Sequence, residues 1–258
     1  MTEKSDTDLR KGFHDQLEGN RDGITHLAAS VTEAIPRATA VLLDGDLEGA
    51  DYMMLADQEI DQRSLELEER CYQILALQAP VASDLRQVIA AVKMIGEIER
   101  SGDLAVNICK AARRIYGHEL DPRLRGTITR MSEQAQQLFR FAIDAYVESD
   151  VPLAAAINDM DDMLDRLHGE FIQEIFQSHA ADRLDLQVGV QLALVARFYE
   201  RIGDHAVNIG SRVRYIVTGW LPGHEAERTL RSTLPTATPN GGEEAQSGAP
   251  RLEASEGG

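Results

Sequence analysis

The sequence is poor in aromatic residues and cysteine, and it contains no long hydrophobic run. Phe, Trp and Tyr make up 5% of the 258 residues, and alternating runs of Val, Ile and Thr are absent, which argues against a β-sheet protein. No apolar stretch approaches the ~18 residues of a membrane-spanning helix. The opening segment Met-Thr-Glu-Lys-Ser-Asp lacks the apolar core of a secretory signal. We therefore expect a cytoplasmic protein that does not insert into membranes.

Positive charge is also scarce. Lys and Arg number 26 against 43 Asp and Glu, which gives a net charge of −17. A nucleic-acid-binding protein usually shows a basic stripe, so no nucleic-acid partner is expected. Only two cysteines are present, Cys71 and Cys109, and both fall within helical patterns. We expect them to be buried free thiols in a reducing compartment.

A ten-residue phrase occurs twice in the chain. Residues 99–108 read Glu-Arg-Ser-Gly-Asp-Leu-Ala-Val-Asn-Ile and residues 200–209 read Glu-Arg-Ile-Gly-Asp-His-Ala-Val-Asn-Ile, identical at eight positions across an offset of 101. Such identity indicates two related halves. On a helix, side chains four residues apart share one face. The polar side chains with this spacing are Glu99, Asp103 and Asn107, and then Glu200, Asp204 and Asn208.

Apolar residues recur at helical spacing through most of the chain, clearly so between residues 88 and 98. Turn and capping signals separate these stretches, for example Asp44-Gly45-Asp46, Pro80, and Asp121-Pro122. Pro36 lies inside the first stretch, where we expect it to kink or interrupt the helix. The predicted helices span residues 7–43, 47–78, 82–116, 122–149, 152–178 and 184–218.

The repeat and the turns predict an all-α protein made of two tandem three-helix bundles that arose by internal duplication. We place the first bundle at residues 1–118 and the second at 119–219. The composition then changes, because residues 219–258 hold four of the eight prolines and seven of the twenty glycines without periodicity. Such a segment buries too little apolar surface to offset its ordering entropy, so residues 220–258 are predicted to be a disordered tail.

Each half carries acidic residues at i and i+4 on two consecutive helices. The eight residues are Asp57, Asp61, Glu99, Asp103, Asp161, Asp165, Glu200 and Asp204. Any one pair alone is most simply a solvated helix face, but the duplication favours a site. If the helices face each other, two carboxylates about 4 Å apart repel by about 4 kcal/mol at an effective dielectric constant of about 20. Protons or a multivalent cation would relieve that repulsion.

All-oxygen ligation of this kind suits Mg²⁺, Mn²⁺, Ca²⁺ or Fe³⁺ better than a thiolate-ligated zinc site. Asn107 and Asn208 could contribute from outer positions. The alternative from another functional class is a carboxylate-bridged di-metal enzyme, but such bundles use Glu-x-x-His. This chain offers only Asp165-Arg-Leu-His168, in one half, and His168 is expected to be a surface or packing residue. His205 lies about 100° around the helix from Asp204.

The repeated Glu-Arg-x-Gly-Asp-x-Ala-Val-Asn-Ile phrase, the Pro80–Arg86 segment, the Asp57-x-x-x-Asp61 helix and Arg10-x-x-Phe13-x-x-x-Leu17 resemble the PhoU family, over roughly residues 8–218. The resemblance implies two tandem three-helix bundles whose acidic motifs bind metal clusters of iron or zinc, or else magnesium or manganese. Those motifs fall on the same eight acidic residues.

The resemblance also implies a role as a cytoplasmic negative regulator without catalytic activity. Members of this family restrain phosphate uptake and phosphate-starvation signalling through the ATPase of the phosphate ABC transporter and a sensor histidine kinase, and a homodimer is expected. The chain departs from the family pattern in its second half, where Ala181–Gln187 stands in place of Pro80–Arg86. A role of Arg86 is therefore not duplicated, and the resemblance does not extend to the tail.

Overall fold

The computed structural model describes residues 2–220, with side chains from residue 12 onward, and this range holds only helices and short links. The helices are α1 (Thr2–Asp44), α2 (Leu47–Gln78), α3 (Ala82–Arg114), α4 (Pro122–Glu148), α5 (Val151–Ala180) and α6 (Leu186–Thr218). None of the helices in the described part is long and apolar enough to cross a membrane. The predicted all-α class is confirmed.

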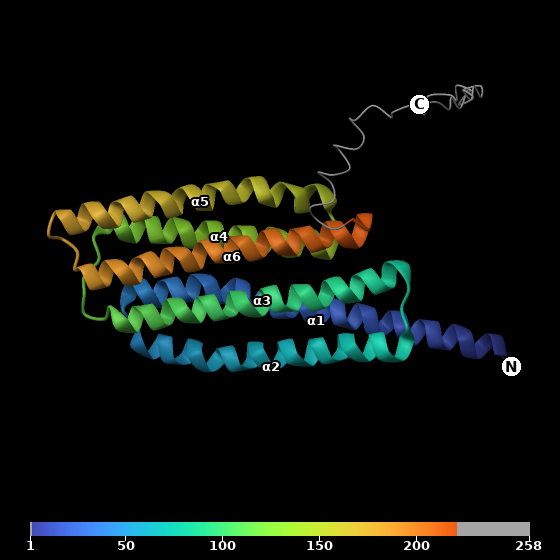
Figure 1. Ribbon diagram of the computed structural model, residues 1–258. Coiled ribbons are helices and arrows are strands. Elements are labelled where there is room, and N and C mark those ends of the chain that lie inside the picture. The colour runs from blue at the N-terminus through green and yellow to red at the C-terminus, as the bar shows by residue number, and fades with distance from the viewer. Residues whose placement is uncertain (1, 221–258) are drawn as a thin grey trace, which may run out of the picture. The chain divides into compact units, whose positions relative to one another are not determined.

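The helices form two three-helix bundles, with α1, α2 and α3 in the first and α4, α5 and α6 in the second (Figure 1). The bundles lie side by side, because α3 packs against α6 and α1 packs against α4. Buried apolar residues of both bundles belong to one continuous core. The predicted tandem architecture is therefore confirmed, while the boundary between residues 118 and 119 stays a prediction. The predicted tail, apart from Trp220, lies outside the described residues.

Aspartate caps explain where four of the helices begin. The aspartate before each of these helices accepts a hydrogen bond from a backbone N–H two or three residues further on. These caps are Asp46, Asp121, Asp150 and Asp185. The helix expected from residue 184 begins at Leu186, because Asp185 serves as its cap. The bounds predicted for α2 are confirmed, and the remaining predicted ends either agree with the observed ones or differ from them by a few residues.

Pro36 does not interrupt α1, so that part of the prediction is wrong. A proline has no N–H to donate to the carbonyl four residues earlier, which here is that of Thr32. The side chain of Gln136 on α4 replaces this donor, with its Nε2 3.1 Å from the oxygen of Thr32. The second bundle thus satisfies a backbone acceptor that the proline leaves open in the first.

Three buried hydroxyl groups join the bundles inside the core. Thr39 of α1 contacts Tyr199 of α6 at 2.7 Å and Ser132 of α4 at 2.6 Å between oxygen atoms. All three residues are buried, and Tyr199 is among the largest fully buried side chains of the described part. Hydrogen bonding offsets the cost of burying these polar groups. The network therefore ties α1, α4 and α6 together at one level.

Both cysteines are buried free thiols, as predicted. Asn20 donates a hydrogen bond from Nδ2 to the Sγ of Cys71 at 3.0 Å. Burial raises the pKa of Cys109 to about 11 and also raises that of Cys71. Because the thiolate is the reactive form, these two residues act as packing groups and not as nucleophiles.

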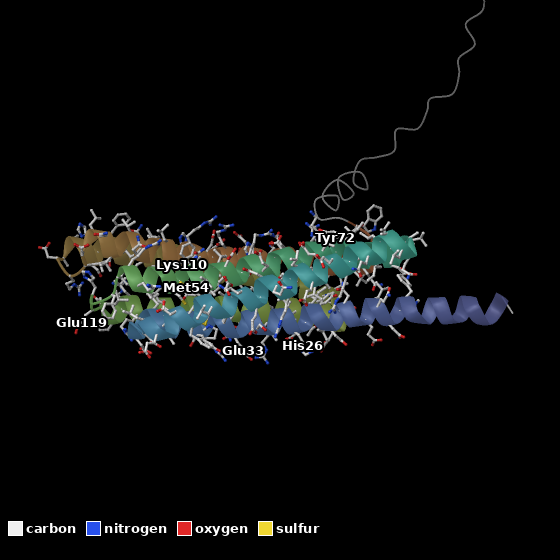
Figure 2. The ribbon with its side chains drawn as sticks, turned by 90° about the horizontal axis from the view of Figure 1, so that it is seen from below. His26, Glu33, Met54, Tyr72, Lys110 and Glu119 are labelled. Carbon is white, nitrogen blue, oxygen red and sulfur yellow. The ribbon has the colours of Figure 1, made fainter. Side chains whose placement is uncertain are left out.

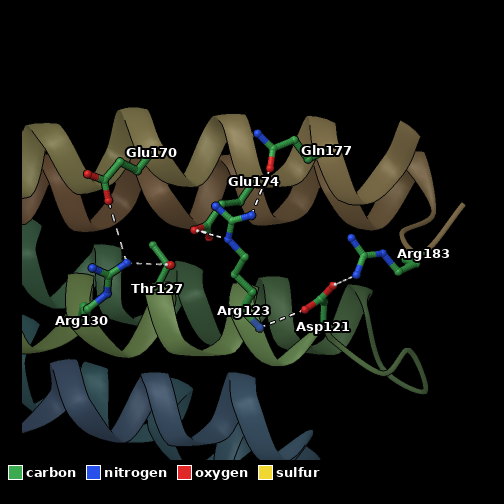
Figure 3. Close-up of polar contacts among 8 residues, drawn as sticks. All are labelled: Asp121, Arg123, Thr127, Arg130, Glu170, Glu174, Gln177 and Arg183. Atoms are coloured by element: carbon green, nitrogen blue, oxygen red, sulfur yellow. Dashed lines mark hydrogen bonds and ion pairs between the residues drawn. The ribbon is translucent and has the colours of Figure 1, made fainter. Parts of the chain in front are cut away.

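Ion pairs join the first turns of α4 to the last turns of α5 (Figure 3). Arg123 pairs with the buried Glu174 at 3.0 Å and donates to Gln177 at 3.1 Å. Arg183, in the link after α5, pairs with Asp121 at 3.2 Å. A buried carboxylate needs such partners, so these contacts hold the end of the second bundle in one arrangement.

Candidate metal centre

The structure brings the four predicted acids of the first bundle together between α2 and α3. Asp57 and Glu99 are partly buried, whereas Asp61 and Asp103 are exposed. Burial raises the pKa of Asp57 to about 6, with further contributions from the charges of Asp61 and Asp103. Burial and the same two acids, together with Asp57, raise the pKa of Glu99. The four carboxylates are therefore near enough to repel one another.

The second bundle repeats this arrangement between α5 and α6. Burial raises the pKa of Asp161 to about 7, and the charges of Asp165, Asp204 and Glu200 raise it further. Burial also raises the pKa values of Glu200 and Asp204, while Arg197 opposes both increases. The predicted duplication of the acidic cluster is thus present in three dimensions.

The glycine of the repeated phrase makes room for the facing carboxylate. A Cβ atom built on Gly203 would lie 2.3 Å from Oδ1 of Asp161, and one on Gly102 would lie 3.6 Å from Oδ1 of Asp57. Any side chain at Gly203 would therefore push the carboxylate of Asp161 away from α6. In the second half, therefore, Gly203 leaves space for one acid and Asp204 supplies a second acid beside it, whereas the distance at Gly102 is an ordinary contact.

The donor chemistry of the second cluster fits a hard cation. Oδ1 of Asp161 and Oε2 of Glu200 are buried and have no hydrogen-bond partner within the described part of the chain. Unpaired carboxylate oxygens in a repulsive cluster are what Mg²⁺ or Mn²⁺ would satisfy. Among the described side chains, residues 12–220, however, no group of three Asp, Glu, His or Cys residues is arranged to hold a metal ion. Metal binding stays a prediction.

The two predicted outer asparagines have different surroundings. Asn107 is partly buried, and its Oδ1 accepts a hydrogen bond from Nζ of Lys110 at 3.3 Å. Lys110, labelled in Figure 2, also lowers the pKa of Asp57 in part. Asn208 is exposed. The first cluster therefore has a nearby positive charge that interacts with it.

Sequence reasoning missed a buried polar contact at the seam between α3 and α6. The hydroxyl of Ser101 donates to the backbone oxygen of Glu97 at 2.8 Å and contacts Nδ1 of His205 at 2.9 Å. Burial lowers the pKa of His205 to about 4 against the opposing charge of Glu97. His205 therefore faces α3 as a neutral group. The missed signal was that Ser101 and His205 occupy the only two positions at which the repeated phrases differ.

The surroundings of His168 are closer to those of a surface or packing residue, as the sequence predicts, than to those of a metal ligand. It is partly buried on α5. Burial lowers its pKa, and the charge of Arg197 lowers it further, although Asp165 acts in the opposite direction. The first bundle has Ser64 at the corresponding position, so no second imidazole is available.

We expect Asp161→Asn to stabilise the metal-free protein, and to do so more at about pH 8 than at about pH 5. The pKa of Asp161 in the folded state, about 7, lies above its ordinary value of 3.8. Between these two values the folded state holds a proton that the unfolded state has lost, so stability falls as pH rises. Asparagine cannot ionise, so the variant does not lose stability in this way as the pH rises. Thermal unfolding of chelator-treated protein, followed by circular dichroism, measures the difference.

Asp159→Asn is the matched control, because Asp159 is exposed on the same helix. Equal stabilisation at both pH values, or the same effect in the control variant, would contradict the prediction. Added Mn²⁺ should raise the melting temperature of the wild-type protein more than that of Asp161→Asn, since a ligand stabilises the state that binds it.

Known proteins match this chain across both bundles. The PhoU domain family model matches residues 24–112 and 128–213. The phosphate-specific transport system accessory protein PhoU homolog 1 of Mycobacterium tuberculosis is 34% identical over 215 residues, which cover 83% of this chain and 96% of that protein. The PhoU homolog of Pseudomonas putida is 30% identical over 82% of each chain.

Solved structures agree with these matches. PhoU of Pseudomonas aeruginosa superimposes with a TM-score of 0.76 at 30% identity, over 81% of this chain and all of the other. The phosphate transport system regulatory protein PhoU of Streptococcus pneumoniae gives a TM-score of 0.75 at 26% identity, covering 81% of this chain and 98% of its own. The match extends over both bundles and includes the repeated acidic phrases, so the chain belongs to the PhoU family.

Proposed function

We propose that the protein is a cytoplasmic accessory protein of phosphate-specific transport that restrains phosphate uptake and phosphate-starvation signalling when phosphate is plentiful. It does so by binding the ATPase of the phosphate ABC transporter and a sensor histidine kinase. The observation that carries this proposal is the family match over both bundles, together with relatives named as accessory proteins of phosphate-specific transport.

The architecture supports a role in bridging proteins. Two similar bundles present two similar sets of surfaces, which suits contact with two partners or with one dimeric partner. The net charge of −17 favours recognition of basic protein surfaces. The buried cysteines and the neutral, buried His205 supply no activated nucleophile, so the described chemistry favours binding over catalysis.

We further propose that metal ions bind the two acidic clusters and stabilise the pairs α2–α3 and α5–α6. Iron, zinc, magnesium and manganese are the candidates. The raised pKa values of Asp57 and Asp161 support this, because a cation would replace the protons that these clusters otherwise retain. A bound metal would thereby fix the surfaces that each bundle presents to a partner.

The proposed homodimer has a suitable contact surface on α6. Residues 186–196 carry no charged side chain, in a chain in which 27% of the residues are charged. Leu186, Val190 and Leu194 follow one another at i, i+4 and i+8 and are all exposed. Two copies with a net charge of −17 repel each other least where neither carries charge. Sedimentation of the purified chain at several concentrations measures this association.

Deleting the protein from its host should raise phosphate uptake and phosphate-starvation gene expression under phosphate-replete conditions, because a restraint is removed. Plasmid-borne wild-type protein should restore both. Replacing Glu99, Asp103, Glu200 and Asp204 together should impair restoration more than replacing either pair, since each bundle partly maintains its own surface. Radiolabelled phosphate uptake and a starvation-response reporter provide the measurements.

Arg63→Gln serves as the control in the same complementation experiment, because Arg63 is exposed on α2 and its ion pair is with Glu59 of the same helix. An unchanged phosphate response in the deletion strain, with expression confirmed in the parent, would refute the proposed function. Turnover by a stoichiometric di-metal centre in the purified protein would favour the alternative of a carboxylate-bridged enzyme.

A further inference from the structure

An open hollow of about 520 Å³ lies over the seam between α3 and α6. Three arginines line it, Arg100 from α3 and Arg197 and Arg201 from α6, together with the amide of Asn208. Guanidinium groups that line one hollow repel one another, although the carboxylates of the same lining offset part of that repulsion. The convergence is also opposite in sign to the chain as a whole, whose net charge is −17.

Most of the hydrogen-bond donors of these arginines remain available. Arg100 pairs with Glu97 at 2.8 Å, and Arg197 pairs with Glu200, in each case within one helix. A guanidinium group has five N–H donors, so one such pair leaves the majority unused. Arg201 is exposed, and the described part of the chain provides it with no ion pair or hydrogen bond.

The three charges act on the same small region. His205 lines the hollow together with all three arginines. Glu97 and Asp204 also line the hollow and offset part of the positive charge. An anion entering the hollow therefore meets three fork-shaped donors beside two carboxylates that weaken its binding.

We propose that this hollow binds a tetrahedral oxyanion, with the guanidinium groups of Arg100, Arg197 and Arg201 as its donors. Planar guanidinium groups match the oxygen edges of phosphate in geometry as well as in charge. Arg100 and Arg201 are equivalent residues of the two halves, whereas the residue that corresponds to Arg197 in the first half is Gly96, so the third guanidinium group comes from the second half alone. Anion binding at this hollow can be measured on the purified chain, so its test does not depend on the proposed function.

Isothermal titration of the chelator-treated, full-length protein with inorganic phosphate at low salt tests this site. Chelation excludes phosphate held only by a metal. Arg201→Gln should weaken binding by about tenfold, as expected for the loss of a charge-assisted hydrogen bond. Arg201→Lys should recover part of the affinity, and Asp204→Asn should strengthen binding because it removes a repelling charge. Rising salt should weaken binding in every variant that binds.

Arg63→Gln, on the far helix α2, is the matched control and should bind phosphate as the wild type does. Glycerol 3-phosphate in place of inorganic phosphate distinguishes a phosphomonoester from the free ion as the preferred ligand. Binding of neither compound, an unchanged affinity in Arg201→Gln, or an equal loss in Arg63→Gln would overturn the proposal. If phosphate does not bind the hollow but deletion of the protein still raises phosphate uptake, the regulatory function stands without this site.

Discussion

Replacing Tyr199 by alanine should lower the free energy of unfolding by about 3–5 kcal/mol, the range for removing a large aromatic side chain from a core. Tyr199 is fully buried on α6, at the level where α1, α4 and α6 meet. The substitution leaves a cavity between the two bundles and removes the hydrogen bond to Thr39. Urea denaturation followed by circular dichroism gives the free energy.

Tyr199→Phe separates the two contributions. Phenylalanine keeps the ring and loses only the hydroxyl, while Thr39 and Ser132 remain paired with each other. The expected loss is therefore about 1 kcal/mol, the net value of one hydrogen bond. If Tyr199→Phe were as unstable as Tyr199→Ala, the packing argument would be wrong and the hydroxyl network would carry the stability.

Replacing Gly210 by alanine should destabilise the protein by about 1–3 kcal/mol, the usual cost of adding volume to a packed interior. A Cβ at Gly210 would lie 2.9 Å from the backbone oxygen of Ala154 and 3.2 Å from Cδ1 of Ile157. A backbone oxygen cannot move aside as a side chain can, so α6 would have to shift away from α5. Thermal unfolding should show the loss.

Gly169→Ala is the matched control, in the neighbouring helix α5. A Cβ at Gly169 meets nothing within 4 Å. Alanine has the higher helix propensity, so this variant should be more stable than the wild type by about 0.5–1 kcal/mol. The same substitution thus has opposite expected signs at two helical glycines. Destabilisation of equal size at both would show that close packing at Gly210 is not the cause.

Local signals in the sequence predicted the helices and the acidic clusters. The caps at Asp46, Asp121 and Asp150 depend on residues two or three positions away, and the acidic pairs depend on i,i+4 spacing repeated in the second half. Helix bounds and cluster members could therefore be predicted without knowing how the bundles pack.

Contacts between the bundles could not be predicted in this way. The donor that satisfies the Thr32 carbonyl before Pro36 comes from Gln136, 104 residues away. Tyr199 and Thr39 are 160 residues apart, and Ser101 and His205 are 104 residues apart. The periodicity of apolar residues does not indicate which faces of two bundles pack together. Polar pairs this far apart in the sequence can therefore be identified only from the structure.

The contact between Ser101 and His205 also determines which half can pair with which. The equivalent positions in the other copy of the phrase are Ile202 and Leu104. If the first halves of two chains packed together, α3 on a second α3, Ser101 would meet Leu104. If α6 packed on a second α6, His205 would meet Ile202. Ser101 would keep its hydrogen bond to the backbone oxygen of Glu97, but Nδ1 of His205 would be buried without its partner, which costs about 1–3 kcal/mol at each contact. The difference between the two phrases therefore favours packing of a first half on a second half over packing of two like halves.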